Sequence, residues 1–199
     1  MIEHVQNLCK ARGLAGYAYF FFDSRNSDKG FLLFENMIRS LLAQLASRCG
    51  GIPGVLKDLY HAHGDGRDRP SLKALRETLQ LVLEGFEDVY IMIDSLDECG
   101  DRIELLRWIK TMADWDSLRV HFLFTSRPEP DIARHLDRIV RVRHVHIEAS
   151  SSNRDIEFYL DTRLSLIQCW DERTNALVKS TLVAGADGMY VFLGEPTFT

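Results

Sequence analysis

Three carboxylates follow a short apolar run in the middle of the chain. Residues 89–93 (V-Y-I-M-I) are of the β-branched and aromatic types that favour a buried strand, and Asp94, Asp97 and Glu98 come directly after them. In open α/β sheets, ligands bind at the carboxyl ends of parallel strands. Mg²⁺ takes few protein carboxylates there and keeps water and phosphate oxygens as its other ligands. The pattern is typical of a Walker B strand.

In this interpretation the acids divide the work of nucleotide hydrolysis. Asp94 holds Mg²⁺ through water, and Asp97 or Glu98 polarises the water that attacks the γ-phosphate. The alternative is that the three acids cap the helix that follows, where carboxylates favour the positive end of the dipole. Capping accounts for one or two acids but less well for a D-x-x-D-E spacing behind a wholly apolar strand, so we favour the nucleotide–metal interpretation.

A second polar group follows the next apolar run. Residues 118–124 predict another buried strand, and Thr125, Ser126 and Arg127 come at its end. The planar guanidinium of Arg127 suits a phosphate through paired hydrogen bonds, and Ser126 supplies a hydroxyl donor. The alternative is a turn started by Pro128, with Arg127 in solvent. The position after a Walker B strand favours a phosphate-sensing role.

One expected partner of these motifs does not occur in the 199 residues. No lysine follows a glycine, so the sequence holds no G-x-x-x-x-G-K-[ST] loop to cradle phosphates.

The elements that must position these residues alternate along the chain. Apolar runs predict strands at 17–22, 89–93, 118–125 and 142–147, and helical spacing predicts helices between them. The helix after the acids is expected to face inward with Ile103, Leu106, Ile109 and Met112. Alternating strands and helices predict an α/β fold with a parallel sheet wrapped by helices. Beyond residue 150 the pattern is wholly helical, so we divide the chain into an α/β core at 1–150 and a helical subdomain at 151–199.

Charge and composition exclude several classes of partner. The formal net charge of −5 gives no basic surface for nucleic acid. No apolar run approaches the roughly 20 residues of a membrane span, and the N-terminal residues have no signal-peptide pattern. The four cysteines are scattered without a C-x-x-C pair, which fits reduced thiols in a cytoplasmic protein.

Taken together, these segments resemble the NACHT-type nucleotide-binding core of fungal STAND proteins, in the variety similar to the N-terminal NTPase region of nephrocystin-3-like NOD-like receptor proteins. The resemblance covers nearly the whole chain. The matching segments are residues 2–5, 18–23, 37–45, 60–66, 89–99, 125–132, 155–160 and 185–190.

The resemblance implies an ATP-driven switch that oligomerises on signalling, with effector and repeat domains in the parent protein. It implies ATP and Mg²⁺ as cofactors, Asp94 as the metal-binding acid, Asp97 and Glu98 as catalytic acids, and Arg127 as the γ-phosphate sensor. It also implies a three-layer P-loop NTPase-like sheet in which the P-loop strand lies between the strand ending at Thr125 and the one at 142–147.

The sequence departs from the family in one way that bears on activity. In relatives the P-loop strand and its G-K-[ST] lie just upstream of the residue matching Met1, so we expect a fragment whose sheet has a gap and whose ATP binding and hydrolysis are impaired. A different function is an interaction or decoy module that packs against intact relatives without nucleotide. A third is a metal-dependent phosphoesterase, for which Asp23 is the only further carboxylate at a strand end.

Overall fold

A computed structural model describes residues 2–23, 33–115, 119–139, 142–145, 149–166 and 170–186. The chain divides into two compact units, Met1–Val142 and Arg143–Thr199, and each is described by itself. None of the described helices is both long enough and apolar enough to cross a membrane.

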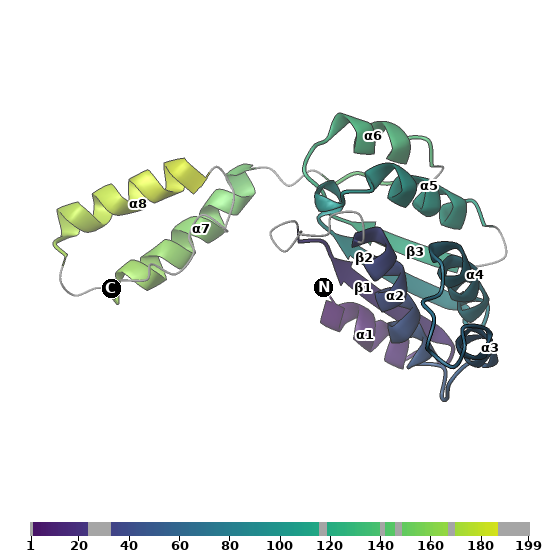
Figure 1. The fold of residues 1–199 in the computed structure, drawn as a ribbon. Coiled ribbons are helices and arrows are strands. Elements are labelled where there is room, and N and C mark those ends of the chain that lie inside the picture. The colour runs from purple at the N-terminus through teal and green to yellow at the C-terminus, as the bar shows by residue number, and fades with distance from the viewer. Residues whose placement is uncertain are drawn as a thin grey trace. The chain divides into compact units, whose positions relative to one another are not determined.

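The first unit is built on three parallel strands, which lie side by side with β2 in the middle (Figure 1). They are β1 (Ala15–Phe21), β2 (Asp88–Asp94) and β3 (Arg119–Phe124). The register pairs Phe21 with Asp94 and Ile93 with Phe124, so all three strands end at the same edge of the sheet. The α/β fold with a parallel P-loop-like sheet is therefore confirmed.

Helices connect the strands and lie on both faces of the sheet. The 3-10 helix η3 (Leu96–Glu98) follows β2 directly. The α-helices of this unit are α1 (Ile2–Lys10), α2 (Leu33–Ala46), α3 (Gly54–Ala62), α4 (Leu72–Leu83), α5 (Arg102–Ala113) and α6 (Pro130–Leu136).

The main core lies between one face of the sheet and helices α2, α4 and α5. Ala18, Val89 and Ile91 from the strands are fully buried, and so are Leu41 and Leu79 from the helices. A chain of edge-to-face aromatic rings, Phe34 to Trp108 to Phe122, joins α2 through α5 to β3. Because successive side chains of a strand point to opposite faces, only every second side chain of each strand belongs to this core.

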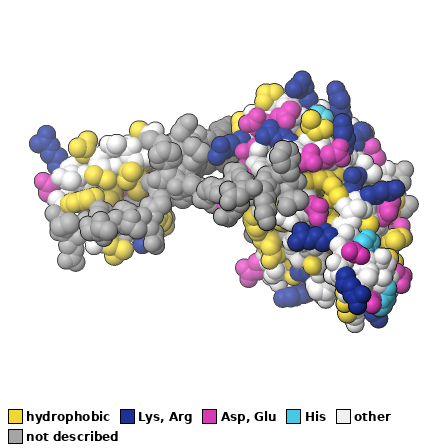
Figure 2. All heavy atoms as spheres, in the orientation of Figure 1, with side chains coloured by type: hydrophobic (Ala, Val, Ile, Leu, Met, Phe, Trp, Pro, Cys, Tyr) yellow, Lys and Arg dark blue, Asp and Glu magenta, His cyan; other side chains and the backbone are white. Residues whose placement is uncertain are grey.

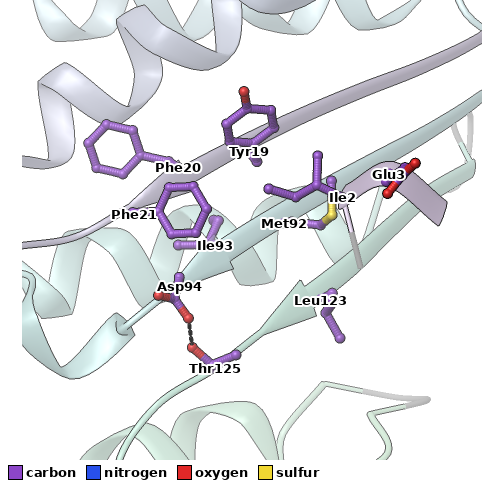
Figure 3. Close-up of a pocket in the computed structure, with 10 residues that line it drawn as sticks. All are labelled: Ile2, Glu3, Tyr19, Phe20, Phe21, Met92, Ile93, Asp94, Leu123 and Thr125. Atoms are coloured by element: carbon purple, nitrogen blue, oxygen red, sulfur yellow. Dashed lines mark hydrogen bonds between the residues drawn. The ribbon is translucent and has the colours of Figure 1, made fainter. Parts of the chain in front are cut away.

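The opposite face is only partly covered, and α1 is the helix that lies on it. Ile2 and Glu3 of α1 line a hollow together with strand residues of this face, among them Tyr19 and Leu123 (Figure 3). Phe21, at the end of β1, is 53% exposed on this face. As far as the described residues show, one face of the sheet is therefore packed against helices and the other is only partly covered.

The two outer edges of the sheet differ. On β1, the side-chain amide of Gln44 in α2 accepts a hydrogen bond from the Tyr19 N–H (3.1 Å) and donates one to the Tyr19 carbonyl (2.7 Å). The Ser40 hydroxyl holds the same amide at 3.1 Å. On β3, the described residues provide no such contact to the outer edge. Among the described residues, a side chain thus satisfies the outward groups of Tyr19 on β1, and β3 has no comparable side-chain contact.

Two sequence predictions are wrong. Residues 142–145 are in no strand, and the rest of the strand predicted at 142–147 lies outside the described residues. β-forming residues become part of a sheet only when a strand pairs with them, and the three-stranded sheet includes none of residues 142–145. In α5, Ile103 is 57% exposed instead of inward, and Leu105 and Trp108 are buried with the other predicted positions.

The second unit contains two helices, α7 (Ala149–Leu164) and α8 (Glu172–Ala186). They form their own small apolar cluster, in which Ile156, Leu160 and Leu164 of α7 pack against Val178 and Leu182 of α8. Figure 2 shows hydrophobic side chains along this pair of helices. The domain boundary that the sequence predicts at residue 150 stays a prediction. The contacts within the structure divide the chain after Val142.

Candidate nucleotide site

The site is built where β2 and β3 end together. The Thr125 N–H donates to the Ile93 carbonyl (3.1 Å), and the Leu96 N–H donates to the Thr125 carbonyl (3.0 Å). The Thr125 hydroxyl donates to Asp94 Oδ1 and accepts from the Ser95 N–H (3.0 Å). Figure 3 shows Asp94 and Thr125 facing each other at the end of the hollow, whose volume is about 370 Å³. Asp94 is thus fixed in place by the neighbouring strand.

A strained turn carries the other acids away from β2. Ser95 lies in the left-handed region (φ 58°, ψ 54°), which few non-glycine residues adopt. Leu96 then enters the core with no exposure, and the Glu98 N–H donates to the Ser95 carbonyl (2.9 Å). Burial of Leu96 stabilises the turn, and the turn sets where Asp97 and Glu98 lie.

Asp97 links this turn to the loop after β3. Its Oδ1 accepts hydrogen bonds from the Arg127 N–H (3.0 Å) and the Ser126 hydroxyl (3.3 Å). Its Oδ2 lies 3.7 Å from Arg127 Nε. The Asp97 side chain is 8% exposed, whereas that of Arg127 is 71% exposed. The carboxylate is therefore occupied within the protein, while most of the Arg127 side chain remains accessible to solvent.

Arg102 makes a second link between the same two segments. Its Nη2 donates to the Asp97 carbonyl (2.7 Å), and its Nη1 lies 3.2 Å from both carboxylate oxygens of Asp131 and 3.7 Å from Glu129. Burial alone would raise the pKa of Asp131, but the charge and hydrogen bonds of Arg102 outweigh it and hold that pKa below its usual value. The loop 126–131 is thus tied to the acidic turn at both of its ends.

Cys99, immediately after the acids, is not a reactive thiol. Burial raises its pKa to about 11, so the thiol stays protonated at neutral pH. It is one of three free cysteines among the described residues, with Cys9 and Cys49.

The structure brings the predicted site residues together at one edge of the sheet. Asp94 is bonded to Thr125, and Asp97 is bonded to Ser126 and Arg127, so both sequence motifs meet. Glu98 belongs to the same turn and is half-buried. Asp23 follows β1 at this edge, but no group of three or more His, Cys, Asp or Glu side chains suited to a metal occurs in the described parts of the chain.

Sequence reasoning missed Arg102 and Gln44. A signal for Arg102 existed, because an arginine at the first position of a helix opposes the helix dipole and is therefore expected to pair with acids elsewhere. Gln44 gave no signal, because its partner Tyr19 is remote in the sequence.

Comparison with known proteins gives one match. A family model described as "Nephrocystin 3, N-terminal" matches residues 1–127. No curated protein matches the chain, and neither does any solved structure. The matched segment contains all three strands, the acidic turn and the residues up to Arg127, which together form the site. On this match, the chain belongs to the nephrocystin 3 N-terminal family.

Proposed function

We propose that the chain is the Walker B and sensor part of a NACHT-type STAND signalling NTPase, whose parent protein uses ATP to drive an oligomerisation switch. The observation that carries the proposal is the meeting of the two motifs, in which Asp94 binds Thr125 and Asp97 binds Arg127. A magnesium–triphosphate site requires a carboxylate for the metal and a cationic group for the phosphates, and Asp94 and Arg127 would supply them at this edge of the sheet.

The residues present fit Mg²⁺ in a limited way. Asp94 offers one carboxylate at the end of β2, and the Thr125 hydroxyl lies against it, so water and phosphate oxygens would have to supply the remaining ligands. The bound ion would offset phosphate charge. The exposed guanidinium of Arg127 is the group that would contact the γ-phosphate, together with the Ser126 hydroxyl.

We assign different roles to the two following acids. The carboxylate of Asp97 already accepts two hydrogen bonds and is nearly inaccessible, so we assign it to holding the loop that carries Arg127. We assign the polarisation of the attacking water to Glu98, which lies in the same turn and is half-buried. In this assignment one carboxylate positions the loop and the other acts as the general base toward water.

The 199 residues contain no G-K-[ST], so we expect them to bind Mg-ATP weakly on their own. Isothermal titration tests this expectation, and micromolar affinity would contradict it. Fluorescent ATP at high concentration tests the site itself. Asp94→Asn and Arg127→Gln should each reduce the magnesium-dependent signal, while Arg107→Gln on the outer surface of α5 should not. An unchanged signal in both site variants would overturn the assignment.

The reading frame offers a test of the parent protein. Transcript mapping should show an in-frame upstream segment encoding G-x-x-x-x-G-K-[ST]. We place the parent in the cytoplasm, which the free thiols of Cys9, Cys49 and Cys99 support, and expect effector and repeat domains and other NTPase domains as its partners, with no role for nucleic acid or membrane.

A second candidate function is an interaction or decoy module that packs against intact relatives. The bare outer edge of β3 favours it, because unpaired strand edges recruit other chains. Co-purification of the chain with a full-length relative in the absence of nucleotide would support this function. Failure to co-purify at high protein concentration would count against it.

A further inference from the structure

Two arginines at the carboxyl edge of the sheet are held in different ways. The side chain of Arg127 is 71% exposed, with Nε 3.7 Å from Asp97 Oδ2. The side chain of Arg102 is 26% exposed, and its terminal nitrogens bond two different segments. Nη2 donates to the Asp97 carbonyl (2.7 Å), and Nη1 donates to the Asp131 carboxylate (3.2 Å). Because a guanidinium presents its donors in a rigid plane, Arg102 fixes the spacing of the two groups that it bonds.

The two bonds of Arg102 reach both segments that carry the proposed chemistry. The Asp97 carbonyl belongs to η3, the turn that also carries Glu98. Asp131 belongs to the first turn of α6, a short way beyond Arg127. Arg127 therefore lies between two attachments, the Asp97 carboxylate at its own N–H and Arg102 at the start of α6. Loss of either attachment leaves the position of Arg127 relative to Glu98 less well defined.

Arg102 is not placed for the stability of either helix that it joins. As the first residue of α5, it brings a positive charge to the positive end of the helix dipole, where an acid is favoured. α6 is held in the main core by Ile132 (3% exposed) and Leu136 (8% exposed). The charge of Arg102 is thus explained by its partners outside α5. Its removal should loosen the link and leave both helices folded.

We propose that Arg102 is the positioning residue of the nucleotide site, and that it holds Glu98 and Arg127 at the spacing that one bound triphosphate requires. The inference rests on the proposed function, in which Arg127 contacts the γ-phosphate. It adds a specific consequence, because only ATP carries the phosphate on which both residues act. Arg102 therefore controls the preference of the site for ATP over ADP, and it does so through these two residues without contacting the nucleotide.

The charge of Arg102 offers a competing explanation, and Asp131 separates the two. Arg102 lies 3.7 Å from Glu129 and 3.2 Å from Asp131, so it offsets negative charge beside the site. If Arg102 acted through charge alone, Asp131→Ala would remove a negative charge and improve the binding of an anionic nucleotide. Under the positioning role, Asp131→Ala breaks the link to α6 and lowers the preference for ATP.

The link is tested first on the 199-residue chain without nucleotide. Three amide hydrogens donate within the turn and the loop, those of Glu98, Arg127 and Glu129. Arg102→Gln should accelerate their exchange at least about fivefold and leave the amides of α2 and α4 at wild-type rates. Arg102→Lys keeps the charge, but its single nitrogen cannot serve both partners, so it should give most of the same acceleration.

The consequence for function is measured with fluorescent ATP and ADP at high concentration in the presence of Mg²⁺. The wild-type chain should bind ATP at least about tenfold more tightly than ADP, because the γ-phosphate adds a charge-assisted bond to Arg127. Arg102→Gln, Arg102→Lys and Asp131→Ala should each reduce this ratio to about twofold and change the ADP affinity less than about twofold. A merely structural defect would instead lower both affinities together.

Arg107→Gln is the matched control, since it makes the same substitution further along α5. Arg107 pairs with Glu104 on its own helix, so this variant should change neither the ratio nor the exchange rates. Circular dichroism shows whether each variant is folded. If Arg102→Gln does not fold, Arg102→Lys and Asp131→Ala decide the question.

The outcomes separate this inference from the proposed function. A wild-type chain with no magnesium-dependent nucleotide signal overturns the proposed function, and the positioning role falls with it. A wild-type signal with no preference for ATP, or with a ratio that the Arg102 variants leave unchanged, overturns the positioning role alone. The same conclusion follows if Arg102→Gln leaves amide exchange at wild-type rates, if both affinities fall together, or if Asp131→Ala binds ATP more tightly.

Discussion

The β1 and β3 edges bound the same three-stranded sheet, yet among the described residues only β1 has a side chain bonded to its outer backbone groups. On β1, a single glutamine from α2 takes both backbone groups of Tyr19, as a neighbouring strand would. On β3, the outward groups of Val120, Phe122 and Phe124 find no partner among the described residues. Both strands are rich in aromatic residues, so their side chains do not explain the difference. A single amide on a covering helix thus satisfies the outward backbone groups of one edge residue, as a paired strand would.

Of the substitutions that would test this comparison, the one with the largest expected effect lies in the core that supports β3. Trp108 is fully buried and packs its ring edge-to-face against Phe122 and Phe34, so it holds β3 against the helices. Trp108→Ala should lower the free energy of unfolding by about 3–5 kcal/mol, measured by urea denaturation. Ile103→Ala on the exposed side of the same helix should cost less than about 0.5 kcal/mol. Equal costs would show that α5 does not support the strand as described.

Opening the β1 edge should have the next largest effect. Gln44→Leu keeps the volume of the side chain but strands the N–H and carbonyl of Tyr19, and should cost about 2 kcal/mol. It should also produce new concentration-dependent association in sedimentation experiments. Gln44→Glu keeps an acceptor for the Tyr19 N–H and should give about half the loss. A fully stable, unchanged Gln44→Leu variant would contradict the role of the amide.

Asp97 connects the turn after β2 to the loop after β3. Removing its side chain should lower the free energy of unfolding less than the changes above, but it should clearly increase the local mobility of the loop. Asp97→Ala leaves the Arg127 N–H without its acceptor, while the Ser126 hydroxyl keeps the Arg127 carbonyl (2.8 Å), and the change should cost about 1–2 kcal/mol. Amide exchange in residues 126–131 should accelerate, because that loop loses one of its two attachments. Asp97→Asn retains a carbonyl acceptor and should stay closer to wild type. Uniform acceleration over the whole sheet would instead indicate global destabilisation.

The smallest expected effect concerns acid stability at the opposite ends of β2 and β3. His121 Nε2 lies 3.1 Å from Asp88 Oδ1, and this hydrogen bond lowers the pKa of Asp88. A carboxyl with a depressed folded pKa stabilises the fold above its unfolded pKa of about 3.9, and the stabilisation is lost as pH falls through the folded value. His121→Phe should therefore move the acid-unfolding midpoint slightly upward. His4→Phe, the same substitution at an exposed position of α1, is the matched control and should leave the midpoint unchanged.

The sequence predicted what depends on local pattern. Three apolar runs became the three strands, and the acids and Arg127 met because parallel strands end at one edge. The sequence pattern could not predict hydrogen bonds between residues that lie far apart in the chain. Gln44 bonds a strand 25 positions earlier, and Arg102 bonds Asp131, 29 positions later. The strand prediction for residues 142–145 failed for a related reason, because β-forming residues become a strand only when a neighbouring strand pairs with them.

The protonated thiol of Cys99 gives the protein a built-in reporter. It is buried directly behind the acidic turn, whereas Cys49 lies at the surface. An alkylating reagent should label Cys49 at once and reach Cys99 only when the turn opens. With Cys9 and Cys169 changed to serine, the labelling rate of Cys99 reports how often the acidic turn at the end of β2 opens locally. The measurement needs no bound ligand.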